Sequence, residues 1–222
     1  MDQRLGVESF DRTDMLVLVR TGIEEVARVF RDQVPGTRVE EDVLGRQVEV
    51  TERTFIAAQL KSQPWTVIRG ITPSLLSTQD RTQDARALSH LLETEAIFFG
   101  VSGEVGALVY QLYERGELTE AFEVVDVSLL DEIERHLSPE ESDARAQLHA
   151  MRATRGQTFA SNSRDVDPAS IEDARAFTNA FLGERVAFVP AFDLQAPQPG
   201  RLTVQLPGYD REDFERVDLI TL

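Results

Sequence analysis

Three strand-like segments follow one another between residues 96 and 125, with only short turns between them. Ala96–Val101 is apolar on both faces, as expected for a strand buried inside a sheet. Val105–Tyr113 and Leu118–Val125 come next, after turns that contain Gly103 and Gly116. Because connections this short can join only antiparallel strands, the segment predicts an antiparallel meander.

The residues before the meander predict four more strands and two helices. Met15–Val19 is a second buried strand, and apolar residues spaced at 3.6 from Ile23 to Val34 predict a helix. Thr21 and Glu24 have the spacing of a capping box at the start of this helix. The remaining elements are expected around Val48 and Val50, at Phe55–Leu60, at Trp65–Ile71 and, as a helix, at about residues 79–93. The predicted order is β-α-β-β-β-α-β-β-β.

The residues after the meander predict helices and polar loops. Ser128 and Ser138 are each followed three residues later by an acid, which is typical of helix starts. A further helix carries Ile171, Ala174, Phe177 and Phe181 and ends near Gly183. Val186–Phe192 and Arg201–Leu206 are strand-like, and residues 210–218 predict an acidic turn.

These patterns predict an α+β fold with a mainly antiparallel sheet, helices packed on it, and a helical, loop-rich C-terminal third. No long tract of Pro, Ser or Gly divides the chain, so we expect a single domain over residues 1–222. An internal boundary near residues 126–156 is the alternative. Trp65, which enters a strand just after a turn, is expected in the core rather than at an interface.

The chain is strongly acidic, with 39 Asp and Glu against 23 Lys and Arg and a net charge of −16. This charge repels phosphate groups, so we expect neither nucleic-acid binding nor attachment to anionic membrane surfaces. The longest apolar runs are far shorter than the roughly 20 residues of a membrane helix. The N-terminus does not have the layout of a signal peptide. We therefore expect a soluble, cytoplasmic protein.

The residue types that most chemistry requires are scarce. The chain has no Cys, which excludes disulfides, thiol nucleophiles and Cys-ligated metals. The three histidines, His90, His136 and His149, do not have the spacing of a zinc-binding helix. We therefore expect no metal and no other cofactor, and no catalytic group is evident.

Two segments carry candidate binding residues. Ser102 and Glu104 belong to a Gly-Val-Ser-Gly-Glu sequence one residue away from a nucleophile elbow, which would need Gly at position 104 and a helix after it. The favoured interpretation is that the glycines shape a hairpin turn. Ser161, Asn162 and Arg164 lie in a polar loop, and loops of this kind often carry recognition.

The favoured interpretation of the charge itself is that it keeps the protein soluble. As a function, the charge and the lack of a catalytic group favour a protein that acts by binding a partner, as an inhibitor, an antidote or an assembly factor does. We expect this partner to be a basic protein, because opposite fields speed encounter. The bias is stronger in the second half: residues 112–222 hold 22 acids and 11 bases, a net of −11, against 17 and 12 before them. One alternative is a small-molecule-binding or hydrolytic enzyme that uses Ser102, Glu104 and Arg164. Another is a mimic of nucleic acid, and the oligomeric state is left open.

Overall fold

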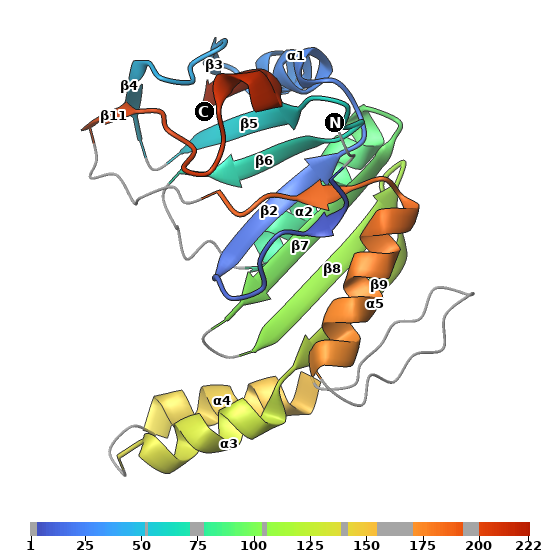
Figure 1. Cartoon of the computed structure of the whole chain (residues 1–222), viewed down its shortest axis with the longest axis vertical. Helices are drawn as coiled ribbons and strands as arrows, with labels where there is room; N and C mark the ends of the chain where they lie inside the picture. Colours follow the sequence, from blue (N-terminus) through green and yellow to red (C-terminus); the bar gives the residue numbers. More distant parts are fainter. Residues whose placement is uncertain are drawn as a thin grey trace.

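The computed structural model describes residues 4–51, 53–71, 78–103, 106–138, 142–154, 171–192 and 200–222 (Figure 1). Its main element is an eight-stranded antiparallel sheet with the strand order β3-β12-β5-β6-β2-β7-β8-β9. The fold is therefore α+β with an antiparallel sheet, as the sequence predicts. The strands of this sheet are β2 (Asp14–Val19), β3 (Arg38–Glu40), β5 (Thr54–Leu60), β6 (Thr66–Gly70), β7 (Glu95–Ser102), β8 (Ala107–Glu114), β9 (Glu117–Val125) and β12 (Phe214–Thr221).

The middle of the sheet has the connectivity of a split β-α-β, or ferredoxin-like, motif. With β3 and β4 (Gln47–Val50), which are inserted after α1, set aside, the chain runs β2-α1-β5-β6-α2-β7, and these four strands lie in the order β5-β6-β2-β7. The helices are α1 (Ile23–Gln33) and α2 (Thr78–Leu91). β8 and β9 extend the sheet at one edge, and β12 and β3 extend it at the other. Since this motif supports many unrelated functions, function has to be argued from particular side chains.

Each face of the sheet buries its own apolar cluster. On one face, Val17 and Phe98 pack with Val26 of α1 and Ala85 of α2. On the other face, Leu18 and Phe99 belong to a cluster that α5 (Ile171–Glu184) covers. Two small sheets complete this second layer: β1 (Gly6–Val7) with β10 (Phe188–Val189), and β4 (Gln47–Val50) with β11 (Gly200–Thr203). Trp65 is buried in the second cluster, which confirms its predicted core position.

A helical hairpin of α3 (Val127–His136) and α4 (Ser142–Thr154) lies beyond one end of the sheet (Figure 1). It has a small apolar cluster of its own around Leu130 and Leu148. The cap of α3 is Asp126, which accepts hydrogen bonds from two backbone amides, and not Ser128 as the capping-box pattern suggested. The internal boundary expected near residues 126–156 falls on this hairpin, and the division into domains stays a prediction.

The structure corrects three further sequence expectations. Gly22, not Thr21, precedes the first turn of α1, and it makes no side-chain cap. Instead, the Ile23 amide donates to Gln59 of β5 at 3.1 Å. Residues 214–221, expected to begin as an acidic turn, form β12 between β3 and β5, and only Arg211–Asp213 makes a short 3-10 turn. Of Val186–Phe192, only Phe188–Val189 is a strand.

Within the described parts of the chain, no helix has the length and apolar character needed to cross a bilayer.

Candidate functional site

Ser102 is the one predicted site residue that falls within the described part of the chain. It ends β7, and its hydroxyl shares a hydrogen bond with Thr13 at 3.3 Å. The next residue, Gly103, lies so close to Asp11 that a Cβ there would be 2.6 Å from the Asp11 carbonyl oxygen. The strand β8 follows and pairs with β7, so Gly103 belongs to a hairpin connection and not to a nucleophile elbow.

The other four predicted site residues lie outside the described residues. They are Glu104, Ser161, Asn162 and Arg164. The structure therefore does not test whether these side chains meet Ser102, and the enzyme hypothesis that depends on their meeting stays a prediction.

A polar cleft lies at the opposite end of β7, β8 and β9 from Ser102. Its volume is about 780 Å³. The first residues of β7 and β9, the last residue of β8 and the residue that follows β2 make up half of its lining residues. The lining residues are Arg20, Glu93, Thr94, Glu95, Glu114, Arg115, Glu117 and Thr119. Four of the eight are Glu, so acidic side chains of this chain are gathered at a concave surface here.

Three of these glutamates lie in one row across neighbouring strands. Glu95 of β7 is directly opposite Glu114 of β8, and Glu114 is directly opposite Glu117 of β9. The register is fixed by a two-residue turn in which Arg115 and Gly116 both have positive φ, 52° and 86°. Like charges directly opposite each other in a sheet are destabilising. This carboxylate row, Glu95, Glu114 and Glu117, is therefore kept at a cost to the fold.

The row is neutralised at one end only. Arg20 donates to Glu95, and Arg185 lies 4.0 Å from the same carboxylate. Glu114 and Glu117 make no ion pair with any described residue, and the same holds for Glu93 at the rim. The outer part of the row therefore presents two carboxylates without an ion pair to the cleft, which Arg115 also lines. In the described ranges no group of three or more His, Asp or Glu side chains is placed to hold a metal ion.

A buried carboxylate, that of Glu120, lies next to the row and shares Arg185 with it. The Glu120 carboxylate, whose residue is 6% exposed, accepts from the Tyr110 hydroxyl at 2.8 Å and from Arg185 at 3.4 Å. The Arg185 guanidinium lies over the Phe181 ring at 4.2 Å, and its backbone carbonyl accepts from the Trp65 indole. These contacts fasten the end of α5 to the sheet and hold Arg185 beside Glu95.

Sequence reasoning missed both the carboxylate row and the buried group beneath it. One available signal was Glu120, an acid that directly precedes the apolar pair Ala121-Phe122 in a strand that runs to Val125. A buried acid at such a position needs a partner. The partner, Arg185, comes 65 residues later, so no local pattern connects the two.

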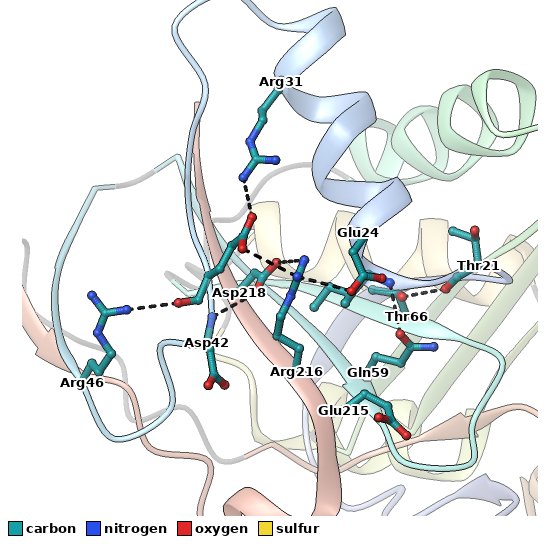
Figure 2. A network of polar contacts seen from close by, with 12 residues as sticks. Thr21, Glu24, Arg31, Asp42, Arg46, Gln59, Thr66, Glu215, Arg216 and Asp218 are labelled. Carbon is teal, nitrogen blue, oxygen red and sulfur yellow. Dashed lines mark hydrogen bonds and ion pairs between the residues drawn. The ribbon is translucent and has the colours of Figure 1, made fainter.

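A second charged network joins α1 to β12 (Figure 2). Arg216 lies between three carboxylates: it donates to Asp218 at 2.8 Å and to Glu24 at 3.4 Å, and it is 3.7 Å from Glu41. Asp218 is fully buried and also accepts from the Asp42 amide. Burial raises the pKa of Asp218 although Arg216 and the amide act to lower it. The principal charged groups of this network pair with one another. The network therefore explains how α1 is held against β12, and it does not present a binding site.

Comparisons of the chain with protein families, with curated proteins and with solved structures give no match.

Proposed function

We propose that this protein acts by binding a basic protein partner, and that the acidic cleft at the end of β7, β8 and β9 is the point of recognition. The carboxylate row carries this proposal. Two of its members, Glu114 and Glu117, face each other and make no ion pair with a described residue, although Arg115 lines the same cleft. An arrangement that costs stability and lies in a cleft is typical of a site kept for binding. A Lys or Arg side chain between the two carboxylates would remove their repulsion.

The charge of the whole chain supports the same partner. At −16 the protein has an extended negative field, which attracts positively charged molecules and raises the rate of encounter. The cleft adds a defined position at which the encounter complex becomes specific. Because part of the attraction is long-range, binding is expected to weaken as salt rises, by screening beyond the Debye length of about 8–10 Å.

Charge-reversal variants test the proposal. The full chain is immobilised and compared with Glu114→Lys/Glu117→Lys and with a control, Glu132→Lys/Glu212→Lys. Each double change removes two negative charges and adds two positive ones, which raises the net charge by about four units, so both variants have the same net charge. The control residues are exposed and lie in α3 and the 3-10 turn, away from the cleft. The probes are a Lys-rich peptide and its counterpart with Glu in place of Lys, followed by native cytosol at low and at moderate salt.

We expect the wild type and the control variant to bind the Lys-rich peptide and to retain the same cytosolic partner, and the cleft variant to lose both. Equal losses in the two variants would show that net charge, and not the cleft, determines binding. Failure of the wild type to bind the Lys-rich peptide, or to capture any partner at either salt concentration, would overturn the proposed function.

A further inference from the structure

β9 is the last strand of the eight-stranded sheet, and among the described residues it pairs only with β8. The Asp126 amide donates to the Gly106 carbonyl at 2.9 Å, which makes Gly106 and Asp126 a hydrogen-bonded pair at the end of this ladder. Such pairs alternate along antiparallel strands. Ala121, Glu123 and Val125 therefore point their backbone N–H and C=O groups away from β8, and in the described part of the chain nothing bonds to these groups.

The two faces of this free edge differ. On the face that α5 covers, Phe122 packs against the half-buried ring of Phe177, with ring centroids 4.9 Å apart. On the opposite face, Glu123 is exposed between Ala121 and Val125, which are buried, Val125 in the cluster of the helical hairpin. Surrounding groups that displace water raise the pKa of the Glu123 carboxyl group. A strand laid along β9 would therefore meet an apolar surface on one side and a carboxylate on the other.

Charge decides between a second copy of the chain and a different partner at this edge. β9 contains three acids, Glu117, Glu120 and Glu123, and no base. Two copies would bring together six acids and two chains of net charge −16 each. Glutamates on an edge strand discourage such self-pairing. Glu120 is buried and paired with Arg185, so Glu117 and Glu123 are the two that would favour a strand of opposite charge. Glu117 belongs to both the carboxylate row and β9, so the free edge continues directly from the cleft.

We propose that an extended basic segment of the partner adds to β9 as a ninth strand, with its apolar side chains toward α5 and its Lys or Arg side chains on the face of Glu123. This mode of recognition is strand addition, in which backbone hydrogen bonds give affinity and alternate side chains give specificity. The inference rests on the proposed function, because it names a segment of the same basic partner; its Lys or Arg side chains would meet Glu123 and not the carboxylate row, which lies on the face of the sheet that α5 covers.

The test uses the full chain and nine-residue peptides, the length of β9. One peptide alternates Lys with Val, and a second has the same composition in a non-alternating order. Two further alternating peptides are N-methylated, one at its Lys amides and one at its Val amides. Lys amides would face β9 in an antiparallel arrangement and Val amides in a parallel one. Binding is measured by fluorescence anisotropy, and amide exchange of Ala121, Glu123 and Val125 is measured by NMR.

Two variants of Glu123 separate the backbone from the charge. Glu123→Pro removes an outward N–H, which an edge strand tolerates, and Glu123→Thr removes the charge but keeps the N–H. Circular dichroism and thermal melting check that both variants fold. We expect the alternating peptide to protect the three amides, and its affinity to fall by about tenfold more in Glu123→Pro than in Glu123→Thr. We also expect one of the two methylated peptides to lose binding.

Three results would overturn strand addition. They are equal binding of the alternating and non-alternating peptides, equal effects of the two methylation patterns, and equal affinities of the two Glu123 variants. Protection of the three amides in the free protein at high concentration would instead assign the edge to a second copy. In the first three cases the proposed function survives as long as the peptides bind through the cleft. If no Lys-containing peptide binds at all, the proposed function fails as well.

Discussion

Arg216 donates a hydrogen bond to Asp218, 2.8 Å away and two residues further along β12. Asp218 is fully buried, whereas Glu24, another carboxylate partner of Arg216, is largely exposed. The two carboxylates therefore give matched variants. We expect Asp218→Ala to lower the free energy of unfolding by about 3 kcal/mol, because the partly buried Arg216 guanidinium loses its closest acceptor and the Asp42 amide loses its acceptor. Glu24→Ala is expected to change it by less than about 1 kcal/mol. Denaturant titrations that show equal losses of unfolding free energy in the two variants would contradict this prediction.

Asp218 also predicts how stability depends on pH. Burial raises its pKa in the folded protein above the ordinary value, so the folded state takes up the proton first as the pH falls. The resulting stabilisation is fully present below the unfolded pKa of about 3.9 and is lost as the pH rises through the folded pKa.

The Asp218→Asn variant has no carboxyl group to titrate at this position, so it serves as the reference for the pH dependence of stability. The free energy of unfolding of the wild type minus that of Asp218→Asn is therefore expected to increase as the pH falls from neutral toward the unfolded pKa. Urea titrations at a series of pH values measure this difference. A difference that stays constant or decreases toward acid would show that Arg216 outweighs burial at this site.

Two glycines predict effects of opposite sign. A Cβ on Gly103 would lie 2.6 Å from the Asp11 carbonyl oxygen, whereas a Cβ on Gly183 of α5 would have nothing within 4 Å. We expect Gly103→Ala to destabilise the protein by about 1–3 kcal/mol through overpacking. Gly183→Ala is expected to stabilise it by about 0.5–1 kcal/mol, because alanine loses less conformational freedom in a helix. Melting temperatures that shift in the same direction would contradict this assignment.

The sequence predicts the meander well because its signals are local. The strands β7, β8 and β9 are apolar runs joined by short turns, and the Arg115-Gly116 turn even places Glu114 opposite Glu117. The third member of the carboxylate row was not predictable in this way. Glu95 meets Glu114 only if the connection that follows Ser102 has the length that pairs Ser102 with Ala107, and the sequence suggested a strand beginning at Val105.

β12 shows why the remaining part of the fold was not predictable. It pairs with β5, about 160 residues earlier in the chain, with Val217 opposite Ala58. Its charged residues suggested a turn, because a buried aspartate in a strand is costly unless it is paired. The pairing that makes Asp218 tolerable involves Arg216 and the amide of Asp42 from a distant loop. Only the tertiary structure brings these groups together.

The carboxylate row predicts a trade-off between stability and binding at Glu117. Glu117→Lys places a cation directly opposite Glu114 in place of a like charge. We expect the free energy of unfolding to rise by about 0.2–1 kcal/mol, the usual size of a cross-strand charge effect. Over the same change, affinity for a Lys-rich peptide is expected to fall by about tenfold, because attraction in the cleft becomes repulsion.

Glu123→Lys is the matched control for stability in this experiment. It lies on the same strand and is exposed, but the residue opposite it is Val109, so the new cation meets no carboxylate across the ladder. Chemical denaturation should therefore show a gain for Glu117→Lys and none for Glu123→Lys. A loss of stability in Glu117→Lys would mean that the row is not strained. A gain in stability with unchanged peptide affinity would mean that the strain at Glu117 has no part in recognition.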